Sequence, residues 1–451
     1  MEKVVVVGGG LGGLILAILL EKASLEYVVL ERSDVAKMPI EGGGVITITP
    51  QIQPLLQQLG LLDALQRIAK PLSRISVLEV DQGSGHQPKV VGTIDNVFSD
   101  AMYGYRSLVI SRPELYNHLL EHVPPEKLLL GKQVQDVEQH DSDSVATCIC
   151  TDGSRYQGII VGADGAYSSV RQSLYRRLKD NGLLAAHDKR PLQYRYRALV
   201  GMTHPLDPNQ FAMIASEDSD TRVMISHGDS PFTVRVYLTY CTHTEFQIWC
   251  VAMTQNRVCW MLDESLKEPM DCPEVEDWST MPQAVQEMCH RYRAMQSPLE
   301  GALMGTLFDL TPAGTMGSLS REEGFFTTWT RGRVVLMGDA CHKAIPYGGQ
   351  PFVQATLDAV ILANTLYAHA QEPSRDIVAR LRSYESKRRV NAKGAVHITC
   401  RFWRLLSRQG RIGRLVRYLA LNFVPRILLQ WLWGRVNHRR LQAEFLPRVG
   451  I

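Results

Sequence analysis

The glycine spacing near the start of the chain is the first pattern that could form a binding site. Gly8, Gly10 and Gly13 form a G-x-G-x-x-G motif directly after an apolar run, 3–7, and open a segment with helical spacing of apolar residues, Leu14–Lys22. The first glycine permits a tight turn, the second lets the backbone approach a pyrophosphate, and the third lets helix and strand pack closely. The free N–H groups of the helix start then attract phosphate. The pattern predicts a dinucleotide site rather than a turn without a ligand.

A carboxylate follows at the distance that such a site requires. Glu31 stands 18 residues after Gly13 and ends a second apolar run, 27–30. An ionised carboxylate only accepts hydrogen bonds, so it suits the hydroxyl groups of a ribose. Strand, helix and second strand together make a βαβ unit of about 30 residues.

Two more acids stand at the ends of apolar runs. Asp164 lies in the motif G-A-D-G, and Asp339 lies in the motif G-D-A. An acid at a strand end beside a helix start suits hydroxyl recognition, because its carboxylate accepts hydrogen bonds. Each motif by itself is also compatible with an ordinary loop.

The remaining helices and strands must position these motifs. The predicted secondary structure changes along the chain. The sequence predicts an α/β fold with a discontinuous nucleotide-binding domain, 1–175 and 300–400. A β-rich segment, 176–299, is predicted to form an inserted antiparallel sheet domain that binds substrate. Residues 401–451 are predicted to form a basic, amphipathic, helical C-terminus.

In their order and distances, the three motifs resemble those of the group A flavin monooxygenases, the relatives of p-hydroxybenzoate and salicylate hydroxylases. The chain is most similar to the branch of fungal secondary metabolism, and the resemblance covers about residues 3–400. It implies FAD held on a two-dinucleotide-binding-like fold, with NAD(P)H as co-substrate. It also implies a flavin C4a-hydroperoxide that hydroxylates or epoxidises a small aromatic or prenylated substrate.

The resemblance assigns FAD contacts to residues that are spread over the chain. It places Glu31 on the adenosine ribose, Arg112 on the pyrophosphate and Asp339 on the ribityl hydroxyls. A guanidinium fork matches a diphosphate, although a surface pairing of Arg112 with Glu114 is the alternative. The other implied contacts come from the small-residue loop near the ribityl chain, the DG motif and the loop at the isoalloxazine ring, which are Gly42, Gly43, Gly44, Asp164, Gly349 and Phe352.

The loop that starts at Gly349 departs from the family's pattern. The family usually has G-Q-G-x-N where this chain has G-Q-P-F-V. Pro351 lacks an N–H group, and Phe352 is bulky where the family has a small residue. A lost donor would weaken stabilisation of the negative charge that gathers at N1–C2=O of reduced flavin. An FAD oxidase or dehydrogenase without oxygen insertion is therefore a second interpretation, and a non-enzymatic, prenyl-protein-binding escort-like protein is a third.

The family has no universal catalytic side chain, so the candidates come from the inserted domain. The resemblance matches Arg197 to a substrate-binding arginine of some fungal members, where it would stabilise a phenolate or enolate. Tyr237 would be its hydrogen-bonding partner. Both residues also fit an ordinary place in a strand, and His342 after the G-D-A motif has either a proton-transfer or a structural role.

Charge is distributed unevenly along the chain. The net charge is +3, but residues 375–451 hold 18 Lys+Arg and 3 Asp+Glu. Arginines recur at steps of three or four from Arg401 to Arg417, which predicts a basic stripe on one helix. Peripheral contact with an anionic membrane and a solvated helix that caps the substrate domain are the two interpretations. No nucleic-acid recognition motif is present.

The cysteines are scattered along the chain, and their spacing indicates the redox state of the protein's compartment. Nine Cys without a CxxC pair predict neither a disulfide framework nor a structural metal, and they indicate a reducing, cytoplasmic location. The first residues lack the pattern of a signal peptide, and no uninterrupted apolar stretch of about 18 residues predicts a membrane span.

Overall fold

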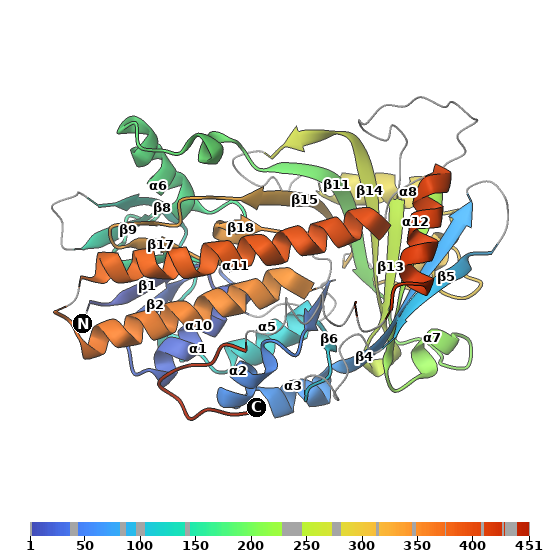
Figure 1. Cartoon of the computed structure of the whole chain (residues 1–451), viewed down its shortest axis with the longest axis horizontal. Coiled ribbons are helices and arrows are strands. Elements are labelled where there is room, and N and C mark those ends of the chain that lie inside the picture. Colours follow the sequence, from blue (N-terminus) through green and yellow to red (C-terminus); the bar gives the residue numbers. More distant parts are fainter. Residues whose placement is uncertain are drawn as a thin grey trace.

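Two β-sheets, with segments of chain that leave one and enter the other, form the framework of the protein (Figure 1). The structure is a computed structural model. It describes residues 2–36, 44–81, 87–95, 104–139, 145–227, 246–272, 281–312, 315–344, 349–374, 376–406, 410–425, 428 and 440–450.

The first sheet carries the predicted βαβ unit. β1 (Val4–Val7) and β2 (Tyr27–Leu30) run parallel and are buried along their whole length, as expected for strands covered on both faces. α1 (Leu11–Lys22) connects them. The strand order is β16-β17-β10-β1-β2-β7, and a hairpin of β8 and β9 extends β10. The other strands are β7 (Leu128–Leu129), β8 (Val134–Glu138), β9 (Ala146–Cys150), β10 (Arg155–Gly162), β16 (Thr330–Arg331) and β17 (Val334–Leu336).

The second sheet takes its strands from three parts of the chain. Its order is β18-β15-β11-β14-β13-β12-β4-β6-β3, with β5 beside β4. Its pairs are antiparallel except for β12 and β4, so the sheet is mixed. The proposed substrate segment, 176–299, supplies its centre. The strands are β3 (Val45–Ile48), β4 (Lys70–Asp81), β5 (Lys89–Asp95), β6 (Leu108–Ser111), β11 (Gln193–Met202), β12 (Ser219–His227), β13 (Phe246–Ala252), β14 (Val258–Asp271), β15 (Gly317–Phe325) and β18 (His342–Lys343).

Helices cover both sheets. α1 packs against α10 (Gln350–Gln371), and α10 packs against the long helix α11 (Ile377–Leu406), which crosses the front of the molecule in Figure 1. α8 (Met281–Tyr292) contacts the second sheet at β15 and packs against α9 (Met304–Asp309). The remaining helices are α2 (Gln53–Gln58), α3 (Leu62–Ile68), α5 (Arg112–Leu120), α6 (Ser169–Asp180), α7 (Ala212–Ala215) and α12 (Gly410–Asn422), with short 3-10 turns at η1 (Pro125–Lys127), η2 (Ala186–Lys189), η3 (Thr254–Asn256) and η4 (Gly338–Ala340).

The predicted basic stripe does not lie on one helix. α11 ends at Leu406 and α12 begins at Gly410, so the two ends of the stripe belong to different helices. Arg417 is buried and pairs with Glu79 of β4, so it is not part of an exposed stripe. Among the described residues, no helix is both long and apolar enough to span a bilayer.

The chain crosses from the first sheet to the second at η4. β17 ends in the first sheet, η4 follows, and β18 then pairs with β15 of the second sheet. At the other end of the strand order, β3 contacts α10, which starts soon after β18. Both outer strands of the second sheet therefore lie close to η4 and the start of α10, and this junction positions the candidate site.

Candidate active site

The glycine motif forms a backbone cradle at the end of β1. Gly8 has φ +103°, and a Cβ atom there would lie 2.6 Å from the carbonyl oxygen of Ala163. A Cβ on Gly13 would lie 2.0 Å from the carbonyl oxygen of Gly8. Gly10 instead faces open space, and as N-cap of α1 it provides no side chain to cap the helix. The cradle therefore fits a diphosphate, which would accept from the backbone N–H groups of the helix start.

Glu31 is held beside this cradle. The N–H of Gly9 donates to its Oε2 atom at 2.7 Å, and the N–H of Ser33 donates to its Oε1 atom at 2.9 Å. Each carboxylate oxygen has a second lone pair. The carboxylate is thus oriented by backbone donors and can still accept from two ribose hydroxyls.

Asp164 lies next to the glycine turn, at the end of β10. Its carboxylate accepts from the hydroxyls of Ser168 and Ser169, at 2.6 and 3.1 Å, and from the N–H of Val170 at 3.2 Å. These bonds fix the start of α6. The DG motif therefore has a structural role already, and its part in binding FAD or NAD(P)H stays a proposal.

Arg112 starts α5 beside the small-residue loop. Its N–H donates to the carbonyl oxygen of Gly44 at 3.0 Å, and Gly44 has φ +115°. Arg112 is exposed to solvent. Partial loss of hydration lowers the pKa of its guanidinium, and the carboxylate of Asp339 opposes that shift. A guanidinium that solvent can reach fits a diphosphate. Gly42 and Gly43 lie outside the described residues.

Asp339 lies on η4, between the two sheets. The Nζ atom of Lys343 is 2.6 Å from its Oδ2 atom. Burial disfavours the charge of Lys343, but Asp339 and Glu322 raise the pKa of this lysine above its ordinary value. Lys343 was not among the predicted site residues, although the spacing of four between acid and base was visible in the sequence.

The loop at the start of α10 tolerates its unusual residues. Gly349 has φ +69°, and a Cβ there would lie 2.8 Å from the Cβ of Thr47. Pro351 occupies the first turn of α10, where a missing N–H breaks no helical hydrogen bond. Phe352 is only 5% exposed and packs in the core of the first sheet. Its bulk is accommodated by that core, and a contact between Phe352 and the cofactor stays a proposal.

The strand register places Arg197 on the face of the second sheet that α8 covers. Arg197 lies opposite Glu264 of β14, so the two side chains share a face. Glu264 Oε1 accepts from Arg291 at 2.7 Å and from the hydroxyl of Tyr292 at 2.5 Å, and both donors belong to α8. Arg197 thus points away from the face that carries Asp263. Tyr237 lies outside the described residues.

The opposite face of this sheet carries a second, buried arginine. Arg321 Nε lies 3.2 Å from Asp263 Oδ1, and the two side chains are 11% and 0% exposed. The positive charge of Arg321 also tends to lower the pKa of Lys343, the residue that pairs with Asp339. Its other side chains are largely apolar or aromatic and include Tyr196, Val223, Trp249 and Met261. The sequence does not indicate this pair, because a pattern alone does not decide which face of the sheet each strand residue occupies.

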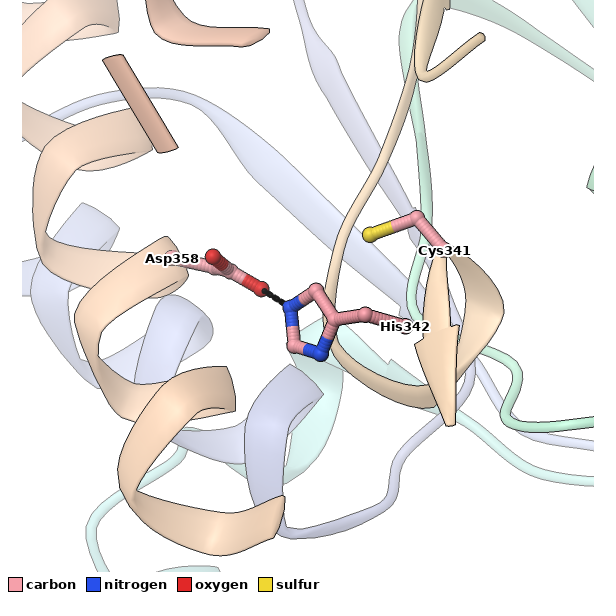
Figure 2. Close-up of side chains that lie close together, drawn as sticks. All are labelled: Cys341, His342 and Asp358. Atoms are coloured by element: carbon pink, nitrogen blue, oxygen red, sulfur yellow. Dashed lines mark hydrogen bonds and ion pairs between the residues drawn. The ribbon is translucent and has the colours of Figure 1, made fainter. Parts of the chain in front are cut away.

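His342 is buried and paired rather than poised for proton transfer to a ligand. Its Nε2 atom lies 2.6 Å from Asp358 Oδ2, and the histidine is 1% exposed (Figure 2). The structure therefore supports the structural interpretation of His342.

These residues together fit an adenosine diphosphate joined to a ribityl chain. The glycine cradle and Arg112 suit the diphosphate, and Glu31 suits the ribose. Asp339 lies at the junction of the two sheets, and its carboxylate would suit the ribityl hydroxyls.

Comparison with known proteins agrees with this fit. The family described as FAD binding domain matches residues 1–298 and 311–399. The FAD-dependent monooxygenase atmM of Aspergillus flavus is 28% identical over 438 residues, which cover 94% of this chain and 82% of that protein. Klebsiella pneumoniae HpxO complexed with FAD and uric acid has a TM-score of 0.70 and 20% identity, over 98% of this chain and 97% of that one. A salicylate hydroxylase substrate complex has a TM-score of 0.66 and 19% identity, over 98% of each chain.

The two structures show the fold, and the family match covers most of the chain. The predicted α/β fold, the FAD cofactor and the resemblance to the fungal secondary-metabolism branch are confirmed. The chain therefore belongs to the FAD binding domain family and is an FAD-dependent monooxygenase of group A, a family for which NAD(P)H is the typical co-substrate.

Proposed function

We propose that this monooxygenase inserts one oxygen atom from O₂ into a small aromatic or prenylated substrate held against the face of the second sheet that carries Asp263. The Arg321–Asp263 pair on that face carries the proposal. A few polar groups in an apolar lining are typical of small-molecule sites. The guanidinium suits an oxygen atom of the substrate, and the apolar and aromatic side chains suit its ring or prenyl chain.

The chain's own residues have three tasks in this proposal. The glycine cradle, Glu31 and Arg112 hold the ADP part of FAD, and Asp339 holds the ribityl hydroxyls. Arg321 orients the substrate and stabilises negative charge on its oxygen, while the sheet face excludes water. Bound FAD supplies hydride acceptance from NAD(P)H and activation of O₂.

Oxidation of NAD(P)H across a panel of phenolic and prenylated compounds, under labelled ¹⁸O₂, tests this function. A substrate of the proposed class speeds NAD(P)H oxidation and yields a product with one ¹⁸O atom, whose position separates hydroxylation from epoxidation. Faster NAD(P)H oxidation with an unlabelled, oxidised product would instead establish the oxidase or dehydrogenase interpretation. HpxO with bound uric acid is a structural neighbour that supports a small, ring-shaped ligand.

Peripheral contact with an anionic membrane is a second proposal, carried by the outer side of α12. Ile412, Leu415, Leu419 and Phe423 recur at steps of three or four and are 71%, 56%, 45% and 65% exposed. The opposite side is anchored, because Arg417 pairs with Glu79. The basic charge of residues 375–451 attracts an anionic surface and would repel a second copy of the same region.

Vesicle sedimentation tests this surface. The chain is expected to sediment with vesicles of phosphatidylcholine and phosphatidylserine, and far less with phosphatidylcholine alone. Leu415→Ser combined with Leu419→Ser should release it, whereas Leu183→Ser, at an exposed leucine elsewhere, should not. Equal sedimentation of the double variant and the native chain would contradict the proposal, and dimerisation without vesicles would point to self-association instead.

A further inference from the structure

The buried carboxylate of Asp358, on α10, contacts Gly338, His342 and Arg388, which come from other segments of the chain. Its Oδ2 atom accepts from the N–H of Gly338, at 2.8 Å, and lies 2.6 Å from Nε2 of His342. Its Oδ1 atom accepts from Nε of Arg388, on α11, at 2.6 Å. Asp358 is 0% exposed and Arg388 is 1% exposed. Figure 2 shows the carboxylate directed from α10 toward the histidine that follows η4.

The same arginine extends this network to the start of α10. Nη2 of Arg388 donates to the side-chain oxygen of Gln354 at 2.8 Å, and Nε2 of Gln354 donates to Oε1 of Gln350 at 3.0 Å. Gln350 directly follows Gly349, the first residue of the loop assigned to the isoalloxazine ring. One chain of hydrogen bonds therefore runs from the η4 turn that carries Asp339 to the start of α10.

The carboxylate of Asp358 is paired within the protein. Burial tends to raise the pKa of Asp358, but the charges of His342 and Arg388 and the hydrogen bonds hold it below its ordinary value. Burial raises the pKa of the Cys341 thiol well above its ordinary value, so the sulfur stays protonated. Cys341, His342 and Asp358 lie close enough to bind an ion, yet a neutral thiol and an adjacent guanidinium do not fit one.

We infer that Asp358, Arg388 and Gln354 are positioning residues that hold the two flavin-contacting turns, at Asp339 and at Gly349, in fixed relation to each other. Hydrogen bonds and ion pairs between buried groups rigidify the segments that they join. The inference rests on the proposed placement of Asp339 and Gly349 beside FAD, and not on the substrate. Breaking the network loosens the cradle without removing any group that touches the cofactor.

Binding of FAD to the cofactor-free protein tests the inference by fluorescence titration. Gln354→Met keeps a similar volume and leaves the Asp358–Arg388 ion pair intact, so it severs only the branch to Gln350. The dissociation constant for FAD should rise roughly 5- to 10-fold, as for loss of one or two hydrogen bonds. The absorption bands and midpoint potential of the bound flavin should also shift, which a purely structural role would not produce. Asp358→Asn should raise the dissociation constant further.

The matched control is Glu372→Gln, which removes the Arg380–Glu372 ion pair between the far ends of the same two helices. It should leave FAD binding and the flavin spectrum unchanged. Asp339→Ala is the reference for the placement of the cofactor. If Asp339→Ala weakens FAD binding and Gln354→Met does not, the positioning role is overturned. If Asp339→Ala has no effect, the placement itself fails. Should Asp358→Asn not fold, Gln354→Met decides alone.

Discussion

Single carboxylates organise the cofactor site at the residue scale. Glu31 is oriented by two backbone N–H groups. Asp339 pairs with the ammonium group of Lys343, and its charge interacts with that of Arg112. These acids come from distant parts of the chain, yet each stands at the end of a buried strand. Their local surroundings therefore decide how firmly FAD is held.

Glu31→Ala should weaken FAD binding, because a charge-assisted acceptor for the ribose is lost. Such a bond contributes about 1.5–3 kcal/mol, or roughly 10- to 100-fold in the dissociation constant. Fluorescence titration of the cofactor-free protein measures this change. Glu26→Ala, at an exposed acid just before β2, is the control and should have no effect. Unchanged affinity in Glu31→Ala would refute the ribose assignment.

Arg321→Met should raise the KM for the substrate while the spectrum of bound FAD stays the same, because Arg321 faces the substrate side rather than the ADP part. Steady-state kinetics with a substrate from the panel measures the effect, expected to be about tenfold or more. Arg293→Met breaks the exposed ion pair with Asp309 and serves as control. A matching rise in KM for Arg197→Met, with none for Arg321→Met, would reverse the assignment of the two arginines.

The depressed pKa of Asp358 predicts a pH dependence of stability. A carboxyl group with a lowered folded pKa stabilises the native state above its unfolded pKa of about 3.9 and loses this contribution as the pH falls through the folded value. The stability gap between the native chain and Asp358→Asn should thus narrow as the pH falls from about 5 to below about 4. Chemical denaturation across this range measures it. A gap that widens on acidification would contradict the lowered pKa.

At the scale of elements, Pro351 in the first turn of α10 suits the helix but removes a possible hydrogen-bond donor to the flavin. Pro351 is compatible with the helix start, while its missing N–H removes one donor from the loop assigned to the flavin. Helix α10 can therefore form normally even if the midpoint potential of the flavin changes.

Pro351→Gly restores that donor and should raise the flavin midpoint potential. A hydrogen bond to the reduced, negatively charged flavin is expected to shift the potential upward by roughly 30 mV. Redox titration of the holoenzyme measures the shift. Pro373→Gly, at an exposed proline just after α10, should leave the potential unchanged. A lower or unchanged potential in Pro351→Gly would show that this position does not face N1–C2=O.

At the scale of the whole molecule, residues 440–450 pack against helices of the nucleotide-binding domain. Residues 440–450 return to α2 and α10, where the side chain of Gln58 donates to the carbonyl oxygens of Ala443 and Pro447, at 2.9 and 3.0 Å. Asn364 of α10 donates to the carbonyl oxygen of Gln442 at 3.0 Å. Contacts between such distant segments couple the tail to the stability of the cofactor domain.

Gln58→Ala should lower the free energy of unfolding by about 1–3 kcal/mol, because several backbone groups of the tail lose their partner. Thermal and chemical denaturation of the holoenzyme measure the change, and limited proteolysis should cut within 440–450 faster. Gln66→Ala, at an exposed position on α3, is the control. Native stability in Gln58→Ala would show that the tail contributes nothing to the fold.

Local patterns in the sequence were sufficient for the βαβ unit and for the family. The glycine turn, the apolar runs of β1 and β2 and the position of Glu31 all lie within about 30 residues, so spacing alone relates them. Short-range backbone preferences and apolar periodicity carry this information.

Only the tertiary structure decided which side chains share a face or a buried cluster. A strand turns successive side chains to opposite faces, so a pattern without its register cannot distinguish the face of Arg197 from that of Arg321. Asp358 and Arg388 are unremarkable in the sequence, because their meaning depends on α10, α11 and η4 packing together. Side-chain partners that are distant along the chain are set by packing, and local spacing does not contain them.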